Sequence, residues 1–189
     1  FAIDKGWTAH PLFKTQLGRN YELHHCHAGA DALFDRAAMV RAVAAEIKRH
    51  PHILAFHRPG FHGMRDLRDS GELPDPVYDA CPACKTEWAA DAAGRIYSCT
   101  ATVGKPGEAL GTFYPEVHLD EDAVFAWQNR DVLSISECRD CPVQLVCGGG
   151  CGALAKNGCG RIDGPDCRPV AELAGIGAAL YGLTDFKDD

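Results

Sequence analysis

The chain has 189 residues, 46% of them hydrophobic, and can therefore bury a core as one domain or as two small ones. Its 26 Asp and Glu residues outnumber its 19 Lys and Arg residues, and the net charge of −7 argues against a nucleic-acid partner, because phosphate binding needs clustered cations. No run of 18 apolar residues and no secretion signal is present, so we expect a soluble, cytoplasmic protein with no membrane partner. The chain begins with Phe1 rather than Met, and we interpret it as a piece of a longer protein.

The beginning of the chain predicts a strand, a helix and a second strand. The short apolar and aromatic run YELHHC, Tyr21–Cys26, is typical of a strand. Within Asp31–His50, apolar residues recur at steps of three and four, which predicts an amphipathic helix that Asp31 caps and Pro51 ends. The run HILAFH, His52–His57, predicts the second strand. Such a unit belongs to the α/β class, and we interpret it as the trailing edge of a larger sheet or partial barrel.

The middle of the chain is expected to hold a connector and a β-hairpin. Residues 58–79 are rich in Pro, Gly and charge, with one short helix around residues 62–69. Thr86–Trp88 and Arg95–Tyr97 are β-prone arms, and Gly94 in the turn between them is expected to have a positive φ.

Three helices are predicted in the second half of the chain. Asp120 can cap a short helix, a second helix runs from about Gly150 to Asn157, and Pro169 opens a final apolar helix. These helices lie among cysteines, which are the main compositional feature of this part of the chain.

The ten cysteines have three physical interpretations, namely disulfides, zinc sites or iron-sulfur clusters. Disulfide frameworks are typical of small secreted domains that lack a sufficient core. This chain has neither a secretion signal nor a shortage of core residues, so disulfides are disfavoured. The choice between zinc and iron-sulfur then depends on the spacing of the cysteines.

The segment CRDCPVQLVCGGGC, residues 138–151, places four thiols close together on a flexible backbone. Two Cys-x-x-Cys pairs, beginning at Cys81 and Cys138, could form a zinc ribbon, but Cys147 and Cys151 would then have no role. An iron-sulfur cube is wider than one metal ion and takes four thiolates from irregularly spaced loops. The three consecutive glycines fit a cube, because glycine lets the backbone approach a bulky inorganic ligand.

The order and spacing of these cysteines resemble the SPASM domain. Cys84 is followed after fourteen residues by Cys99, with Gly94 five positions before it. A Cys-x2-Cys-x5-Cys-x3-Cys run then begins at Cys138, and Cys167 follows in the tripeptide PDC. In that family the domain is the C-terminal extension of radical SAM enzymes, many of which modify peptides or proteins. It carries two auxiliary four-iron four-sulfur clusters.

The resemblance implies eight metal ligands in two sets. The first auxiliary cluster would take Cys81, Cys84, Cys99 and Cys151. The second would take Cys138, Cys141, Cys147 and Cys167. The implied fold is α/β followed by α+β, with the end of a radical SAM partial barrel in residues 1–60, a connector in 61–80, the SPASM domain in 81–170 and a C-terminal helix and tail in 171–189.

Two departures from the family pattern limit what the resemblance implies. Sulfatase-maturing members carry an acid directly after the hairpin cysteine, whereas this chain has Thr100, so formylglycine formation is not expected. The Cys-x3-Cys-x2-Cys motif that binds the radical-generating cluster is absent from these 189 residues. S-adenosylmethionine and a third cluster are therefore expected only in a missing N-terminal part, and no residue of this chain is assigned to catalysis.

The remaining chemical side chains have structural interpretations. The run HHCH, His24–His27, is a packing or surface strand, a lining of the barrel interior or, least favoured, a metal site. Cys159 is expected to be a spare thiol, although it competes with Cys167 as the last ligand. Three aromatic side chains are expected in the core around the clusters: Trp88, Tyr97 and Trp127.

Two functions remain open from the sequence. The favoured one is the auxiliary-cluster portion of a radical SAM oxidoreductase, a peptide- or protein-modifying maturase. Its partners would be a peptide or protein substrate, a radical SAM barrel in the same or a partner chain, and an external electron donor. The alternative is a stand-alone iron-sulfur module for electron transfer or peptide binding, and a zinc-stabilised structural module is a distant third.

Overall fold

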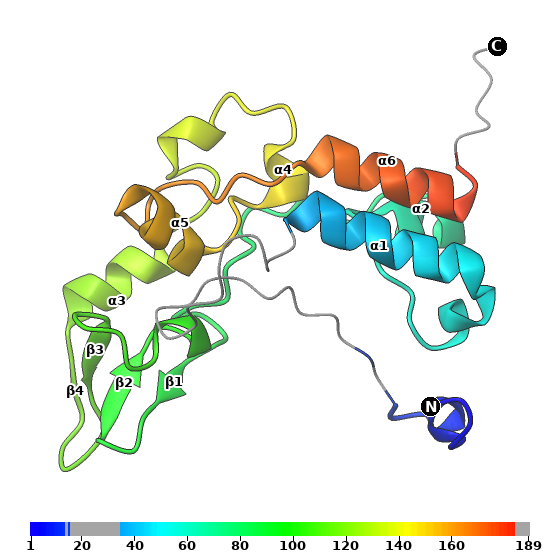
Figure 1. Cartoon of the computed structure of the whole chain (residues 1–189). Helices are drawn as coiled ribbons and strands as arrows, with labels where there is room; N and C mark the ends of the chain where they lie inside the picture. The colour runs from blue at the N-terminus through cyan, green and yellow to red at the C-terminus, as the bar shows by residue number, and fades with distance from the viewer. Residues whose placement is uncertain (14, 16–34, 184–189) are drawn as a thin grey trace. The chain divides into compact units, whose positions relative to one another are not determined.

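The computed structural model describes residues 1–13, 15 and 35–183. Within them the chain forms six α-helices and a four-stranded antiparallel sheet, which is an α+β composition (Figure 1). It divides into two compact units. The helical unit comprises Phe1–Asp75 and Pro169–Asp189, and the cysteine unit comprises Pro76–Arg168. All eight cysteines expected to bind metal lie in the cysteine unit.

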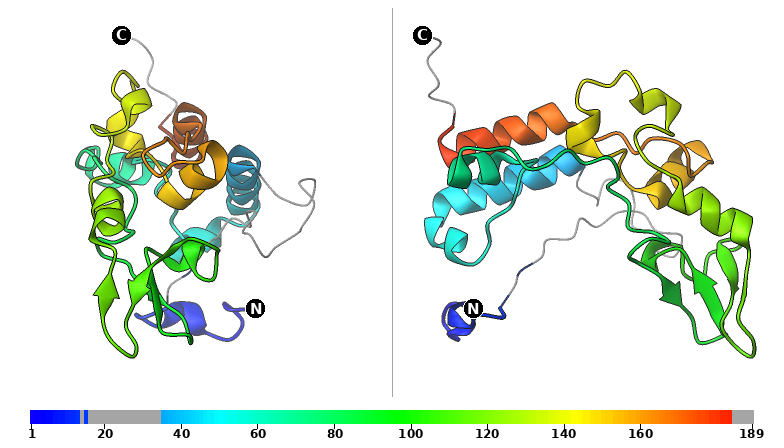
Figure 2. Two further views of the ribbon diagram at one scale, coloured as in Figure 1. Left: turned by 90° about the vertical axis from the view of Figure 1, so that its left-hand side faces the viewer. Right: turned by 180° about the vertical axis from the view of Figure 1, so that it is seen from behind.

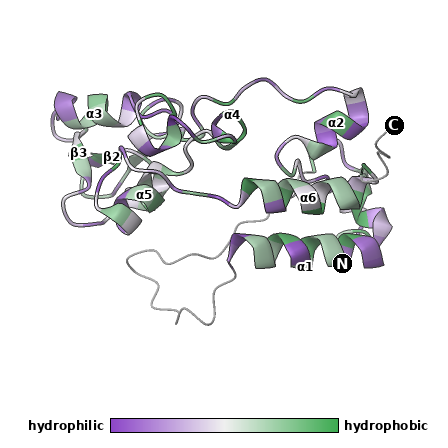
Figure 3. Ribbon diagram, turned by 90° about the horizontal axis from the view of Figure 1, so that it is seen from above, coloured by the Kyte–Doolittle hydropathy of each residue, from purple (hydrophilic) through white to green (hydrophobic). Residues whose placement is uncertain are grey.

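The helical unit is built on three helices, α1 (Arg36–Arg49), α2 (Met64–Ser70) and α6 (Val170–Tyr181). The helices α1 and α6 lie side by side, and α2 also packs on α6 (Figures 1 and 2). Apolar residues on one face of α1 are buried, and Figure 3 colours much of α6 toward the hydrophobic end of the scale. The amphipathic helix expected before Pro51 is thus confirmed over these residues.

The helix α1 begins later than the expected cap at Asp31, which lies outside the described residues. Its N-cap is Asp35, whose Oδ1 accepts a hydrogen bond from the Ala38 N–H at 2.6 Å. The short helix expected around residues 62–69 is present as α2.

The expected second strand, His52–His57, is wrong, because a 3-10 helix covers Pro51–Ala55. The Ile53 and Phe56 N–H groups donate to carbonyls three residues earlier, at 2.9 and 3.1 Å. Pro51 favours this turn because its fixed φ suits a first helical position. In the described chain no strand lies beside this run to accept ladder hydrogen bonds. The other expected strand, Tyr21–Cys26, lies outside the described residues, so the strand-helix-strand unit has no support from the structure.

The sheet of the cysteine unit has the strand order β1 (Ala89–Ala90), β2 (Arg95–Tyr97), β3 (Ala109–Thr112) and β4 (His118–Leu119). All three pairings are antiparallel, and the expected hairpin with its second arm at β2 is confirmed. Gly94 in its turn has a φ of 81°, as predicted.

The first arm of the hairpin starts three residues later and ends two residues later than the expected Thr86–Trp88. The reason is a tight turn, because the N–H groups of Lys85, Thr86 and Glu87 all donate to the Pro82 carbonyl at 2.9 to 3.1 Å. Trp88 is consequently not a core residue, with 42% of its surface exposed. The other two aromatic side chains expected in the core, Tyr97 and Trp127, are 1% and 3% exposed.

Three helices complete the cysteine unit: α3 (Glu121–Gln128), α4 (Gln144–Cys147) and α5 (Gly152–Cys159). The predicted cap of α3 is confirmed, since Asp120 Oδ1 accepts from the Ala123 N–H at 3.0 Å. The helix α5 ends two residues later than predicted, at a left-handed Gly160. Short 3-10 helices occur at Trp7–Ala9, Thr100–Thr102 and Ser136–Cys138. Among the helices that the structure describes, none has the length and apolar character needed to span a membrane.

Candidate metal centres

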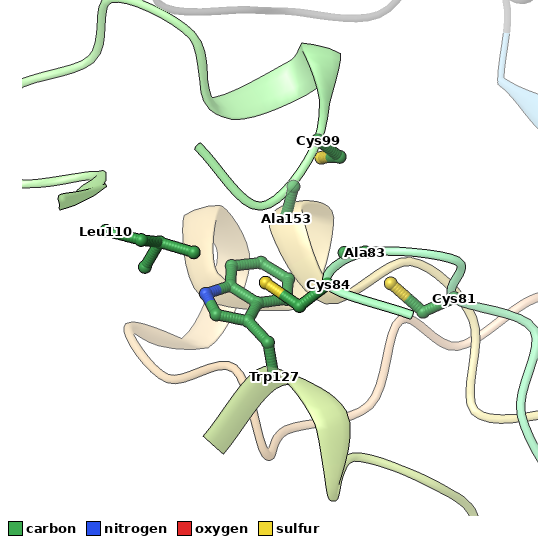
Figure 4. Close-up of a cluster of buried hydrophobic side chains, with 7 residues drawn as sticks. All are labelled: Cys81, Ala83, Cys84, Cys99, Leu110, Trp127 and Ala153. Carbon is green, nitrogen blue, oxygen red and sulfur yellow. The ribbon is translucent and has the colours of Figure 1, made fainter. Parts of the chain in front are cut away.

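Four of the predicted ligands share one apolar cluster, here called the first thiol group: Cys81, Cys84, Cys99 and Cys151. The first three are at most 7% exposed, and Cys151 packs against them from the start of α5. Figure 4 shows Cys84 beside the Trp127 ring, Leu110 beyond that ring, and Cys81 and Cys99 farther from it. The apolar wall excludes water from one side of this group.

The turn that carries Cys81 and Cys84 is held by the chain around it. The Cys84 backbone is left-handed, with a φ of 58°, and its N–H donates to the carbonyls of Glu87 and Ser98 at 3.0 and 3.1 Å. The Cys81 N–H donates to Asp79 Oδ1 at 2.9 Å. A left-handed conformation is costly for a non-glycine residue, and the turn is fixed by these contacts in spite of that cost. Both thiols are thereby directed into the same cluster.

Burial and neighbouring cysteines raise the pKa values of two thiols in the first thiol group. Burial, followed by the charges of Cys99 and Cys81, raises the pKa of Cys84 to about 12, while Lys85 lowers it. Burial also raises the pKa of Cys99, to which Cys151 contributes as a neighbouring charge. These thiols therefore hold protons at neutral pH when no cation is bound, and binding a metal would release them.

The other four predicted ligands form a second thiol group: Cys138, Cys141, Cys147 and Cys167. Burial and then the charges of Cys147, Cys167 and Cys141 raise the pKa of Cys138, and a reciprocal effect raises the pKa of Cys167. This group is less enclosed, because Cys138 is buried, Cys141 and Cys147 are half-buried and Cys167 is exposed. The side chain of Cys138 packs with Val132 and Ile135, which are fully buried.

The run Gly148–Gly150 joins the two groups, because Cys147 belongs to the second and Cys151 to the first. All three glycines are left-handed, with φ between 65° and 74°. A Cβ at Gly150 would stand 2.3 Å from the Asp166 carbonyl oxygen, so the space around the run is filled by protein. Asp166 Oδ2 also accepts from the Cys151 N–H at 3.0 Å. The glycines thus let the segment before Cys167 pack on the backbone between the groups.

Sequence reasoning missed the buried side chain that lies behind this run. Arg130 is 1% exposed and donates hydrogen bonds to the backbone carbonyls of Gly149, Gly150, Ile162 and Gly164. Its charge also lowers the pKa of Cys138, against the stronger effect of burial. A single Arg in the sequence QNRD has no spacing or motif that distinguishes it from a surface cation.

The other candidate residues fall outside the two groups. Cys159 is exposed and its Sγ donates to the Ala155 carbonyl at 3.0 Å, which agrees with a spare thiol. The N–H and the hydroxyl of Thr100 both donate to Glu87 Oε1 at 3.1 Å. The His24–His27 run lies outside the described residues.

The donor set fits a wide polynuclear group better than a single ion. Among the described residues, no three His, Cys, Asp or Glu side chains converge closely enough to hold one metal ion. Each thiol group nevertheless supplies four sulfur ligands, and a four-iron cube takes four thiolates that stand farther apart than the ligands of one zinc ion.

Comparison with protein-family models, with curated proteins and with solved structures finds no match to this chain. The resemblance to the SPASM domain therefore rests on the order and spacing of the cysteines.

Proposed function

We propose that this chain is the auxiliary-cluster portion, similar to a SPASM domain, of a radical SAM oxidoreductase that modifies a peptide or protein. One observation supports the proposal. Cys81, Cys84 and Cys99 share one buried cluster against which Cys151 packs, while the charges of Cys147, Cys167 and Cys141 act on Cys138. Sequence neighbours do not explain this arrangement, since Cys151 joins Cys81 and Cys99 instead of nearby Cys147.

In the proposed protein each group would hold one four-iron four-sulfur cluster. Such clusters supply one-electron transfer when bound. The chain itself contributes the thiolates, an apolar wall on the first group, and backbone bends that fix the positions of the ligands. The first group excludes water more completely, because three of its thiols and Trp127 are buried.

The absence of the Cys-x3-Cys-x2-Cys motif in these residues favours one alternative, a module that transfers electrons or binds a peptide without chemistry of its own. The two functions share the same clusters. They differ in whether a radical SAM barrel, in the same or a partner chain, acts on the same substrate.

The proposal is tested by the metal content of the chain. Anaerobic reconstitution with iron and sulfide is expected to give about eight irons and eight sulfides per chain, because two cubes each contain four of both. The protein would be brown, and reductant would bleach its absorption. Stoichiometric zinc in protein prepared with iron and without oxygen would refute the iron-sulfur assignment.

A further inference from the structure

The side chain of Arg130 carries a buried positive charge that makes its described hydrogen bonds to backbone carbonyls. Its Nε donates to the Ile162 carbonyl at 2.6 Å, and its Nη1 to that of Gly150 at 3.0 Å. Its Nη2 donates to the carbonyls of Gly149 and Gly164 at 2.7 and 3.0 Å. Carbonyl dipoles satisfy the N–H groups but carry no net charge, and within the described part of the chain no carboxylate pairs with this guanidinium.

The guanidinium lies on the side of the second thiol group. A Cβ built on Gly149 would have the Ile135 Cδ1, the Arg130 Nη1 and the Val132 Cγ1 as its nearest neighbours. Ile135 and Val132 are the residues that pack with Cys138. The Cδ of Arg130, in contrast, lies 3.2 Å from a Cβ built on Gly152, at the start of α5. The stem therefore passes the first group and the charge ends nearer the second.

The cation that follows Cys84 is compensated, whereas the Nζ of buried Lys105 donates, among the described residues, only to Asn157 Oδ1 at 3.4 Å. Lys85, which follows Cys84, pairs with the Asp79 carboxylate and donates to the Arg130 carbonyl at 2.9 Å. The cation that follows Cys167 has an acid beside it, since Arg168 Nε lies 3.7 Å from Asp166 Oδ2, although within the described chain this buried Nε donates no hydrogen bond. Of Lys85, Arg168 and Arg130, only Arg130 has no acid paired with it in the part of the chain that the structure describes.

We propose that Arg130 is a positioning and electrostatic residue that makes the second cluster easier to reduce than the first. The inference rests on the proposed function, because it concerns clusters held by the two thiol groups. Reduction adds one negative charge to a cluster, and a nearby buried cation without a counter-ion stabilises that charge. Net charge and hydrogen bonding around the sulfurs are the properties that set the potentials of iron-sulfur clusters. The same guanidinium fixes the glycine run between the groups through its hydrogen bonds.

The test, on the reconstituted chain, separates the effect of the Arg130 charge from the effect of the Arg130 hydrogen bonds. Arg130→Gln removes the charge and keeps part of the hydrogen bonding, Arg130→Lys keeps the charge, and Lys156→Met removes, as a control, a half-buried charge of α5 that pairs with Glu108. The midpoint potentials of both clusters are measured by redox titration monitored by electron paramagnetic resonance. A Cys99→Ser variant, which leaves the second group intact, assigns the signals.

Arg130→Gln is expected to lower the reduced-to-oxidised ratio of the second cluster at least tenfold at a given potential, about 59 mV for a one-electron couple. Arg130→Lys and Lys156→Met are expected to change that ratio less than twofold. If iron stays bound, an unmoved potential in Arg130→Gln overturns the inference. So does an equal shift in Arg130→Gln and Arg130→Lys, because hydrogen bonding and not charge would then be responsible.

A second variant tests the same charge difference if Arg130→Gln loses iron. Asp79→Asn removes the acid that compensates Lys85, keeps an oxygen acceptor for the Cys81 N–H, and changes none of the four carbonyls that accept from the Arg130 guanidinium. The reduced-to-oxidised ratio of the first cluster should then rise about tenfold and approach that of the second, again about 59 mV. An unchanged ratio refutes the inference. A wild-type chain that binds no iron refutes instead the proposed function, so the two failures are distinguishable.

Discussion

Gly150→Ala should separate the two thiol groups by disturbing the backbone between them. The φ of Gly150 is 71°, and an alanine in this left-handed region costs about 1–2 kcal/mol. The new Cβ would also stand 2.3 Å from the Asp166 carbonyl oxygen, which forces the segment before Cys167 away. Two hydrogen bonds connect Asp166 to the backbone on either side of Gly150. The Asp166 N–H donates to the Gly149 carbonyl, and the Cys151 N–H donates to Asp166 Oδ2.

Each of these hydrogen bonds contributes about 1 kcal/mol, so the free energy of unfolding should fall by about 3 kcal/mol in total. The matched control is Gly158→Ala in α5, where the glycine has ordinary helical surroundings and nothing within 4 Å of a new Cβ. There the same substitution should stabilise the protein by up to about 1 kcal/mol, because alanine is the better helix former.

Anaerobic urea unfolding of the reconstituted chain, followed by circular dichroism, measures both effects. With a slope of about 2 kcal/mol per molar urea, the midpoint of Gly150→Ala should fall by about 1.5 M. Its iron content should fall by about half, since Cys167 would be displaced from the second group. A Gly150→Ala protein within about 1 kcal/mol of the wild type and with full iron would refute this account of the glycine run.

Three further outcomes are expected. Cys147→Ser should lose about half of the iron, normalised to folded protein, while Cys159→Ser should lose none; equal losses would contradict the division into two groups. The reconstituted 189-residue chain should release no 5′-deoxyadenosine from S-adenosylmethionine, because in the proposed function its eight thiols would complete two clusters, and multiple turnovers in a chromatographic assay would overturn that assignment. Burial raises the pKa of Asp91, but hydrogen bonds from the Tyr97 hydroxyl and from Arg95 and Ala93 lower it more, so the net pKa is below its usual range. Its carboxylate therefore stabilises the hairpin above the unfolded pKa of about 3.9, and the benefit is lost as pH falls through the lower folded pKa. Asp91→Asn should speed amide hydrogen exchange of Phe113 at neutral pH but not at pH about 2, and an equal effect at both would argue against this pH dependence.

The elements of the cysteine unit could be predicted where local signals agree with the surrounding structure. Gly94 is in a turn that needs a positive φ, and Asp120 precedes a helix whose first N–H groups need an acceptor. The strand predicted after Pro51 was wrong because a run of four to six apolar residues suits a strand or a short helix equally. Which one forms depends on a neighbouring strand, and that information is not local.

The grouping of the thiols could be predicted only through the resemblance, because spacing along the chain does not say which sulfurs meet in space. Cys147 and Cys151 are four residues apart and belong to different groups, whereas Cys99 and Cys151 are distant in sequence and share one cluster. Nothing in the sequence indicated that the Arg130 side chain would be buried. Its burial follows from carbonyls of two loops that approach each other only in the folded unit.

The crossing of the two thiol groups at Gly148–Gly150 also bears on how the protein can be assembled. A ribosome releases the cysteines from the N-terminal end, so the first group lacks its last member until Cys151 has emerged, and the second until Cys167. No cut through the chain separates one complete set of four from the other. Neither set of four cysteines could therefore be moved to another protein as one continuous segment without taking part of the other set, and in the proposed function each metal site would be complete only after its last cysteine has been synthesised.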